Sequence, residues 1–290
     1  MFSKLKGIKK YLNPYRIFKV LQSIIKEKNG WRKIFGLVLV YSKACYLFKI
    51  KRNGYNLNFF PTALSVTFFQ HSEAWRYEEV FLEKFLRPND IIIDIGANIG
   101  NVGIRAASLF DTIKVYMIEA HPVVFNFMVQ NIKLNSLKNI ITFNVALGNK
   151  DSEFIKFSNH LSDDLNSIIA EREEGILVRL CKLDSILQEE QIDFIKIDVE
   201  GFEFEVLKGA ENLLKRTSCI MYESWDVHYK KYNTDSTEVM KYLRGMGFEI
   251  YKWTEQNLTR IDSNYCSINC ENLLAIKNYI EFQERMSTSK

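Results

Sequence analysis

The sequence predicts an α/β protein with a doubly wound, mostly parallel sheet of seven strands and an N-terminal helical extension. Short apolar runs rich in β-branched residues alternate with amphipathic segments from residue 90 to residue 253, which is typical of strands joined by helices. The last two strands, Phe248–Trp253 and Asn272–Ile276, lack a strong helix between them, which indicates an antiparallel pair. The 290 residues suffice for one large domain and an appendage.

The other elements follow from local periodicity and from helix or turn signals. Residues Tyr55–Phe69 are expected to form a short extended stretch or hairpin, and the polar stretch from residue 150 to Gly175 an irregular loop that contacts substrate or is plain surface. Five further strands are predicted over Asp90–Ile95, 114–119, Ile140–Ala146, Phe194–Asp198 and Cys219–Glu223. Helices are predicted over Trp75–Leu86, about Asn101–Phe110, from Pro122, after Asp198 with Val206, Ala210 and Leu213 inward, and near Ser236–Arg244.

The N-terminal segment is strongly basic. Residues 1–52 contain 14 Lys/Arg and one acid, Glu27, which leaves 25 Lys/Arg and 34 Asp/Glu downstream. Helices are predicted from Asn13-Pro14 to Gly30 and from Trp31 to about Phe48. A basic amphipathic helix favours an anionic membrane surface as partner, and the alternative is a lid packed on the domain. No nucleic-acid-binding module accompanies the charge.

Composition points to a reducing compartment. The five cysteines are odd in number and form no C-x-x-C pair, so free thiols are expected and a zinc site is not. The apolar run Ile34–Tyr41 is eight residues long, too short to span a bilayer. We therefore expect a cytoplasmic protein that is free or peripheral at the inner face of the membrane.

The predicted domain boundaries are a basic helical extension over 1–54, the main domain over 55–280 and a tail over 281–290.

Residues 91–103 form the most informative segment, a buried strand that runs into a glycine-rich turn and a helix start. Gly96 and Gly100 allow a ligand to approach the backbone, and Asn98 tolerates left-handed geometry. The spacing G-x-x-x-G-x-x-G differs from the dinucleotide pattern G-x-G-x-x-G. Asp94 at the strand's end opposes a pyrophosphate and suits a cation, so charge favours S-adenosylmethionine over NAD.

The next predicted strand ends in Glu119, 19 residues beyond Gly100. A carboxylate at this place can accept hydrogen bonds from both hydroxyls of a ribose. NAD and S-adenosylmethionine share that ribose, so Glu119 does not distinguish them.

A second dense motif is Lys196-Ile197-Asp198-Val199-Glu200-Gly201-Phe202-Glu203. Asp198 and Glu200 lie at the carboxyl end of a strand, on the same sheet edge as the glycine loop. They could bind a metal, act as a base or face the sulfonium of the ligand. The competing interpretation is that Glu200 and Glu203 only stabilise a helix N-terminus.

With these motifs, the sequence resembles the FkbM family of S-adenosylmethionine-dependent methyltransferases. The resemblance covers about residues 90–224 and is carried by Asp94 to Gly100, Glu119-Ala120-His121-Pro122, Asn131, Asn135, Leu183-Asp184 and Lys196 to Gly201 with Glu203, Leu207, Lys208 and Gly209. Members often have E-P-x-P where this chain has Glu119-Ala120-His121-Pro122, which changes the turn but retains the acid. Residues 1–60 match no part of the family core.

The resemblance implies a class I, Rossmann-like methyltransferase domain and O-methyl transfer to a hydroxyl of a sugar, glycan or glycolipid. It implies that Asp94, Gly96 and Gly100 line the methionine end, Glu119 binds the ribose, residues 144–146 flank the adenine and Asp198 lies near the methyl group. The cofactor-binding residues expected on this basis are Asp94, Gly96, Ala97, Asn98, Gly100, Glu119, Ala120, Asn144, Ala146 and Asp198.

A sugar hydroxyl is barely ionised at neutral pH, so a base or metal should assist. The candidate catalytic residues are Asp198, Glu200, Glu223 and His228, with Asp226 as a further candidate base. His228 has the most suitable intrinsic pKa. No residue is assigned to a metal, although a divalent ion would be compatible with the chemistry. Trp225, Tyr229 and Tyr232 could stack on a sugar ring.

Three alternatives stay open. One is an NAD-dependent sugar oxidoreductase, another is O-methylation of a small secondary metabolite, and the third is a non-catalytic membrane-associated module. The second differs from the leading hypothesis only in its acceptor. The intact ligand loop argues against the third.

Overall fold

The computed structural model describes residues 30–158, 167–168, 174–255 and 257–287. The chain groups into two compact units, residues 1–50 with 58–74 and residues 51–57 with 75–290. The predicted helix from Asn13 to Gly30 lies outside the described residues, apart from Gly30 itself. The domain boundaries placed at residues 54 and 280 stay predictions.

In the first unit, α3 (Gly30–Tyr41) packs on α4 (Ala63–Gln70). The helix predicted to reach Phe48 ends at Tyr41, and a 3₁₀ turn, η1 (Ala44–Leu47), follows Lys43, whose φ is 61°. α3 leaves a group of apolar side chains exposed to solvent: Trp31, Ile34, Phe35, Leu37, Val38 and Tyr41. The anionic surface expected to bind this part of the chain stays a prediction.

The stretch predicted as extended over Tyr55–Phe69 is a helix in its second half. Leu64, Val66 and Phe68 alternate with polar residues, and this period of two is typical of a strand. The hydroxyl of Thr62 instead accepts the N–H of Ser65 at 3.1 Å and caps the N-terminus of α4. Only the short hairpin of β1 (Lys49–Lys51) and β2 (Asn56–Asn58) is extended.

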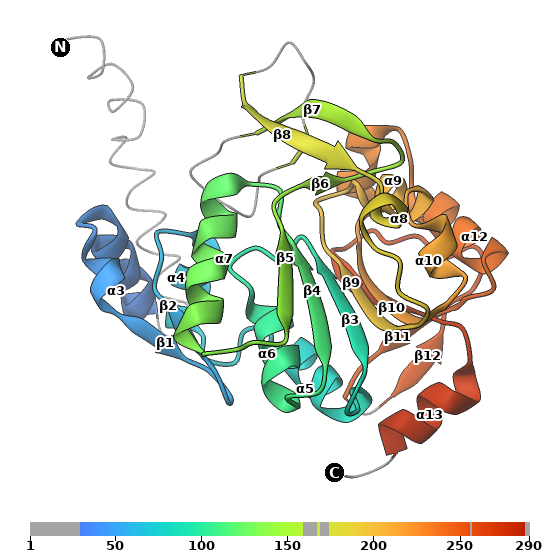
Figure 1. Ribbon diagram of the computed structural model, residues 1–290, viewed down its shortest axis with the longest axis horizontal. Helices are drawn as coiled ribbons and strands as arrows, with labels where there is room; N and C mark the ends of the chain where they lie inside the picture. The colour runs from blue at the N-terminus through green and yellow to red at the C-terminus, as the bar shows by residue number, and fades with distance from the viewer. Residues whose placement is uncertain (1–29, 159–166, 169–173, 256, 288–290) are drawn as a thin grey trace. The chain divides into compact units, whose positions relative to one another are not determined.

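The second unit contains an eight-stranded sheet in the order β12-β11-β13-β10-β9-β3-β4-β5 (Figure 1). Pairing is parallel from β10 through β5 and antiparallel at β13, β11 and β12. The bounds are β3 (Ile91–Ile95), β4 (Lys114–Ile118), β5 (Ile140–Phe143), β9 (Ile192–Ile197), β10 (Thr217–Ser224), β11 (Glu249–Trp253), β12 (Leu258–Arg260) and β13 (Glu271–Ile276). The doubly wound, mostly parallel, Rossmann-like fold is confirmed, and the strand beyond the predicted seven is the short β12.

The strand order reverses between β3 and β9, because β4 and β5 extend the sheet to one side and β10 to the other. A ligand in such a sheet binds beyond the carboxyl ends of the strands at this switch point. The glycine loop follows β3 and the Asp198 motif follows β9. The topology therefore brings the two predicted motifs together.

Helices cover both faces of the sheet (Figure 1). One face, which includes Ile93 and Ile95, packs on α9, α10 and α12. On the other face Phe194 contacts Phe81 of α5. Alternate residues of one strand point to opposite faces, so the buried strands β3 and β9 are largely apolar, with Asp94, Asp193 and Lys196 as exceptions. The helices are α5 (Arg76–Phe85), α6 (Asn101–Leu109), α7 (Pro122–Leu134), α8 (Leu183–Ile186), α9 (Glu203–Lys208), α10 (Glu211–Leu214), α11 (Asp226–Tyr229) with η3 (Lys230–Tyr232), α12 (Ser236–Gly245) and α13 (Tyr279–Ser287).

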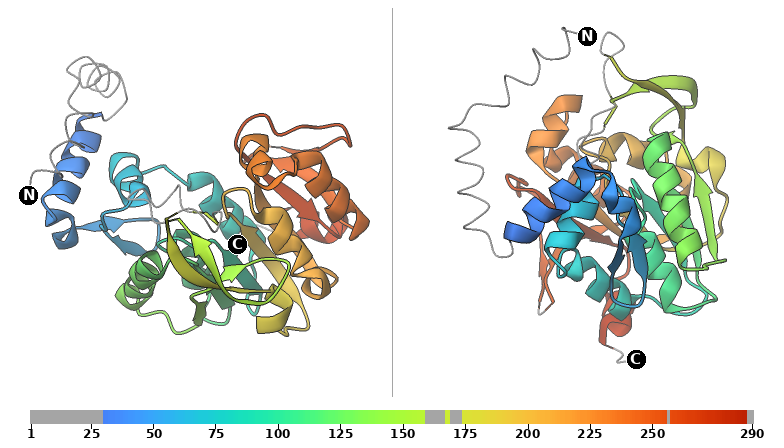
Figure 2. Two further views of the ribbon diagram at one scale, coloured as in Figure 1. Left: turned by 90° about the horizontal axis from the view of Figure 1, so that it is seen from above. Right: turned by 90° about the vertical axis from the view of Figure 1, so that its left-hand side faces the viewer.

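The strand predicted over Ile140–Ala146 is divided between two sheets. β5 ends at Phe143, and β6 (Ala146–Leu147) pairs with β8 (Ile176–Cys181), which pairs with β7 (Ser152–Phe157) (Figure 2). Asn144 turns the chain because its side-chain amide donates to the carbonyls of Glu119 and Ala120, at 2.8 and 3.0 Å. The stretch expected to be irregular thus begins with a strand, and half of it, residues 159–166 and 169–173, lies outside the described residues.

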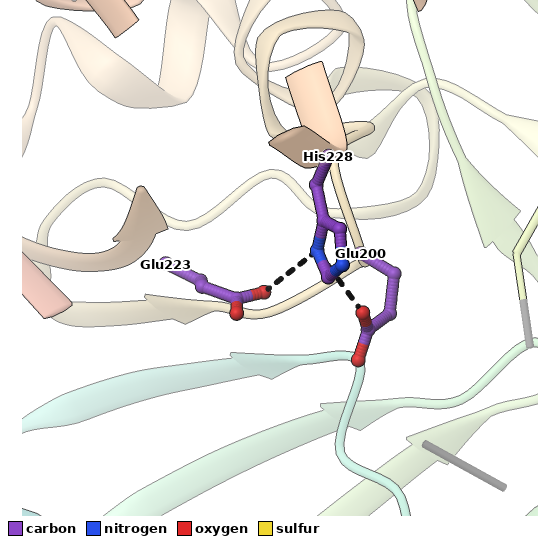
Figure 3. Close-up of side chains that lie close together, drawn as sticks. All are labelled: Glu200, Glu223 and His228. Carbon is purple, nitrogen blue, oxygen red and sulfur yellow. Dashed lines mark ion pairs between the residues drawn. The ribbon is translucent and has the colours of Figure 1, made fainter. Parts of the chain in front are cut away.

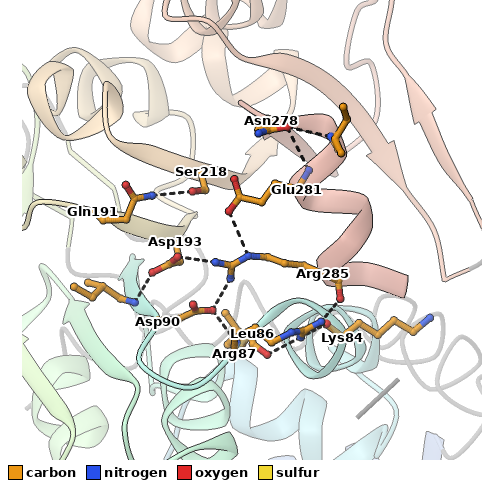
Figure 4. A network of polar contacts seen from close by, with 12 residues as sticks. Lys84, Leu86, Arg87, Asp90, Gln191, Asp193, Ser218, Asn278, Glu281 and Arg285 are labelled. Atoms are coloured by element: carbon orange, nitrogen blue, oxygen red, sulfur yellow. Dashed lines mark hydrogen bonds and ion pairs between the residues drawn. The ribbon is translucent and has the colours of Figure 1, made fainter. Parts of the chain in front are cut away.

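Arg285 fixes α13 to the amino ends of β3 and β9 (Figure 4). Its guanidinium contacts Asp90 at 2.8 Å and Asp193 at 2.9 Å, and both acids are largely buried. Burial and the neighbouring Asp193 raise the pKa of Asp90 to about 6, against the opposing effect of Arg285. Residues 281–287 of the predicted tail therefore lie in a packed helix.

We expect Arg285→Ala to reduce the free energy of unfolding by about 3–5 kcal/mol, because it leaves two buried carboxylates without their cation. The pKa of folded Asp90 lies above its unfolded value of about 3.9, so the folded state holds more protons between pH 4 and 6 and stability falls as pH rises. The stability lost in Arg285→Ala should be larger at pH 7.5 than at pH 5, because Asp90 is ionised at the higher pH and then lacks its cation. Urea unfolding at both pH values measures it.

The matched control is Arg260→Ala, which breaks the exposed Arg260–Glu249 pair. An exposed pair contributes little to stability, because water and salt screen it. Equal decreases in the free energy of unfolding of the two variants would contradict the role given to Arg285.

Among the residues that the structure describes, no helix has both the length and the apolar character to cross a bilayer.

Candidate active site

The glycine loop lies against the Asp198 motif. The N–H groups of Gly96 and Ala97 both donate to the carbonyl of Ile118 at 3.0 Å. Gly96 has φ of 75°, and a Cβ there would lie 1.8 Å from the carbonyl oxygen of Asp198. Only glycine fits at this position, both because of its conformation and because of the close backbone contact.

Two further residues of the loop have left-handed geometry, with φ of 50° at Asn98 and 95° at Gly100. Asn98 donates its N–H to Glu119 at 2.9 Å. Its side-chain oxygen is buried and accepts no hydrogen bond from any residue that the structure describes. A buried acceptor without a donor has a cost, and a hydroxyl or ammonium of a bound ligand would satisfy it.

Asp94 lies under the loop. Its carboxylate accepts the N–H of Gly103 at 2.8 Å, in the first turn of α6. Burial raises its pKa to about 7, the bond from Gly103 and the charge of Lys196 oppose the rise, and Asp198 adds to it. Asp94 therefore stabilises α6 in addition to the role of facing a cation that the sequence predicts.

Glu119 follows β4 and is buried. Its carboxylate accepts the N–H of Asn98 at 2.9 Å and that of His121 at 2.8 Å. A buried carboxylate at this place has the acceptor chemistry that suits the hydroxyls of a ribose. The exposed Asn144 holds Ala120 in place, and Ala146 is buried in the small sheet.

Lys196 is a site residue to which the sequence analysis assigned no role. Its ammonium is buried inside β9 and contacts Asp198 at 3.1 Å and Asn272 at 3.1 Å. Although desolvation opposes it, the charges of Asp198, Glu78 and Glu223 raise the pKa of Lys196. A lysine between Ile195 and Ile197 of a buried strand was the available signal.

The turn after β9 separates the two glutamates of the second motif. Glu203 accepts the N–H groups of Val199 and Gly201, at 3.0 and 3.3 Å, and so caps the turn. Burial, followed by the charge of Glu223, raises its pKa to about 8. Glu200 is instead left-handed, with φ of 58°, and its side chain contacts His228. Glu203 therefore stabilises the turn that precedes α9, whereas Glu200 contacts the histidine.

Glu200, Glu223 and His228 form a compact cluster, which we call the Glu–Glu–His cluster (Figure 3). The Nδ1 atom of His228 lies 3.2 Å from Glu200 Oε2 and 3.8 Å from Glu223 Oε2. The members come from the turn after β9, the end of β10 and α11. Three of the four candidate catalytic side chains thus meet, and the fourth, Asp198, contributes to the raised pKa of Glu223.

The cluster binds protons unusually tightly at its carboxylates. Burial, followed by the charges of Glu223 and Asp198, raises the pKa of Glu200 to about 9. Burial and Asp198 raise the pKa of Glu223 to about 7, although Cys270 donates to it from 2.7 Å. Burial and Lys231 lower the pKa of His228, so its imidazole is neutral at pH 7. No sequence pattern indicated that Cys270 would contact Glu223.

The neighbouring candidates have structural partners. Asp226 accepts the N–H of Ser236 at 2.8 Å, which fixes α12. Tyr229 is fully buried and donates to the carbonyl of Glu223, so it does not stack on a sugar. Tyr232 packs on Phe202. Trp225, whose ring centroid lies 4.3 Å from that of His228, is the partly exposed aromatic residue beside the cluster.

A model of the methyltransferase FkbM domain matches residues 94–250, more than half of the chain. The chain belongs to the FkbM methyltransferase family. Methyltransferase sdnD of Sordaria araneosa is 26% identical over 191 residues, 52% of this chain and 74% of that protein. The matched segment of the family includes both motifs and the whole Glu–Glu–His cluster.

Among solved structures, precorrin-6y C5,15-methyltransferase from Geobacter metallireducens is 16% identical, with a TM-score of 0.41 over 69% of this chain and 87% of that chain. An S-adenosylmethionine-dependent methyltransferase from Aquifex aeolicus is 16% identical, with a TM-score of 0.41 over 71% of this chain and 93% of that chain.

The residues at the switch point fit S-adenosylmethionine, the cofactor of this family's fold. Gly96 and Gly100 allow close approach to the backbone, Asn98 has an unsatisfied buried oxygen, and Glu119 places a buried carboxylate beside Asn98. The family membership and this chemistry agree on a methyltransferase.

Proposed function

We propose that the protein transfers a methyl group from S-adenosylmethionine to a hydroxyl group of a sugar, glycan or glycolipid. The observation that carries the proposal is the Glu–Glu–His cluster at the strand ends beside the glycine loop, where proton-accepting groups converge. Transfer to oxygen needs such a group, because an alcohol is a poor nucleophile until it loses its proton.

S-adenosylmethionine supplies a methyl group on a positively charged sulfur and leaves as a neutral thioether. The chain's part is to bind and orient the acceptor so that its oxygen lies in line with the carbon–sulfur bond. As the oxygen–carbon bond forms and the carbon–sulfur bond breaks, the hydroxyl proton passes to the cluster. Glu223, with a pKa raised to about 7, is the member whose pKa lies nearest to neutral pH.

The acceptor class follows from the family resemblance and from Trp225, which offers a partly exposed ring beside His228. An aromatic face next to a proton acceptor suits the apolar face of a sugar ring. A small secondary metabolite with a hydroxyl group is the alternative acceptor.

The test combines binding with product analysis. Calorimetry should show that the full chain binds S-adenosylmethionine and not NAD, and incubation with sugar-containing acceptors should add 14 Da, the mass of one methylene, to one hydroxyl. Glu223→Gln should lower kcat by about 10²–10⁴ with little change in cofactor affinity, the usual effect of losing an acid–base group. Binding of NAD alone would overturn the proposal, and methylation confined to non-sugar metabolites would change the acceptor.

A further inference from the structure

The Glu–Glu–His cluster contains two features that proton transfer alone does not explain. Among the residues that the structure describes, Nδ1 of His228 and Oε2 of Glu223 are buried and make no hydrogen bond. Nδ1 of His228 lies 3.2 Å from Oε2 of Glu200 and 3.8 Å from Oε2 of Glu223. The three side chains point toward one another without satisfying one another (Figure 3).

The spacing of the three ligand atoms fits a single ion. All three lie within 4.8 Å of one another. Ligands about 2.1 Å from a metal lie about 3.0 Å apart at right angles and about 3.4 Å apart in a tetrahedron, from bond lengths typical of nitrogen and oxygen ligands. The separations of 3.2 and 3.8 Å require only small adjustments of two side chains.

The local charge also favours a cation. Four carboxylates surround the position, Glu200 and Glu223 in the cluster with Asp198 and Glu203 nearby. The ammonium groups that face them belong to Lys196, which is paired with Asp198, and to Lys231 on η3. A divalent ion would take the place of the protons that these carboxyl groups otherwise hold.

We propose that Glu200, Glu223 and His228 bind one divalent metal ion next to the methyl-transfer site. Two carboxylates and one imidazole suit Mn²⁺, Fe²⁺ or Zn²⁺ better than Ca²⁺. Three protein ligands leave coordination positions open, as at catalytic metal sites. This inference rests on the proposed function and changes its acid–base part. A bound ion would polarise the acceptor hydroxyl, and the half-exposed carboxylate of Asp198, in place of the metal-bound Glu223, would accept the proton.

The experiment uses the full chain treated with EDTA and then dialysed, with neither cofactor nor acceptor present. Titration with Mn²⁺ followed by electron paramagnetic resonance, and with Zn²⁺ by calorimetry, should show one ion per chain. Glu200→Gln and His228→Asn should each weaken binding by at least tenfold, with unchanged circular dichroism spectra. Glu205→Gln is the matched control, because Glu205 lies on α9 near the same turn and pairs with Lys208.

The results separate this inference from the proposed function. Folded protein that binds neither ion at 1 mM, or binding that persists in Glu200→Gln and His228→Asn, overturns the metal site. Methyl transfer at an unchanged rate in EDTA would do the same and leave the proposed function standing. Specific metal binding by a protein that methylates no hydroxyl would retain the site and reject the proposed function.

Discussion

Gly96→Ala is expected to abolish S-adenosylmethionine binding. The added methyl would lie 1.8 Å from the carbonyl oxygen of Asp198, and the backbone has φ of 75°. The backbone N–H of Gly96 donates to the carbonyl of Ile118, and that of Asp198 donates to the carbonyl of Ile95. Neither backbone segment can therefore move away easily. The loops after β3 and β9 must therefore separate. We expect at least about 3 kcal/mol of lost binding free energy, or about 100-fold in Kd.

Calorimetry with S-adenosylmethionine, together with the melting temperature, measures this effect. The matched control is Gly245→Ala at the end of α12, where an added Cβ has no neighbour within 4 Å. That substitution should leave cofactor affinity unchanged and stability equal or slightly higher. A Kd for Gly96→Ala within threefold of the wild-type value would show that the close contact between the loops does not shape the cofactor site.

Asp94→Asn tests whether the charge at the end of β3 attracts the cationic cofactor. Asparagine retains an oxygen that can accept the N–H of Gly103, so α6 keeps its contact. We expect the variant to fold and to lose most of its affinity for S-adenosylmethionine. Asp94→Ala should lose that affinity too, and in addition about 1–3 kcal/mol of stability, because the N–H of Gly103 is left unpaired.

The pH dependence of the affinity for S-adenosylmethionine tests the charge of Asp94 more directly than the affinity at one pH. With a pKa of about 7, Asp94 is largely protonated at pH 6 and ionised at pH 8. Since a cationic ligand prefers the ionised form, the affinity of the wild type relative to Asp94→Asn should rise about tenfold over this range. Taking the ratio cancels the titration of the ligand's own amino group. A ratio that is constant with pH would contradict a charge role for Asp94.

The same pKa has a consequence for folding. Folded Asp94 has a pKa above its unfolded value of about 3.9, so stability falls as pH rises from 4 to 7, and Asp94→Asn should remove this slope. Asp193→Asn is the matched control. Asp193 is also buried and accepts a backbone N–H, from Ile91 at 2.9 Å, but it lies at the opposite ends of the strands. It should change stability without affecting cofactor binding.

Most of the main sheet could be predicted, because its strands are apolar on both faces and end in glycine or acidic residues. Ile192–Ile197 is buried throughout and Ile91–Ile95 is buried apart from the half-buried Ile91, so their composition indicates a central strand in any context. The errors fall where a tertiary contact overrides local pattern. Leu64, Val66 and Phe68 alternate as in a strand, yet the cap from Thr62 begins a helix. β7 and β8 were missed because their flanking segment is polar.

The candidate site shows the same division. Asp94, Glu119 and Asp198 were identifiable because strand ends carry ligand-binding residues in this kind of sheet. The parts given to Lys196, Glu203 and Cys270 were not, since each depends on a partner far away in the chain or across a turn. Lys196, for example, meets Asn272, whose amide donates to Glu78.

The sequence by itself determined the fold class, the family and the identity of the donor, because these depend on periodicity and on two local motifs. Only the tertiary structure decided how Glu200, Glu223 and His228 combine. Their contact requires β10 to pair beside β9 and α11 to turn back over both strand ends. The balance among burial, neighbouring carboxylates and Lys231 then sets their affinity for protons and cations. No local pattern encodes that balance, since each of its terms depends on distances between residues that are separated in the chain.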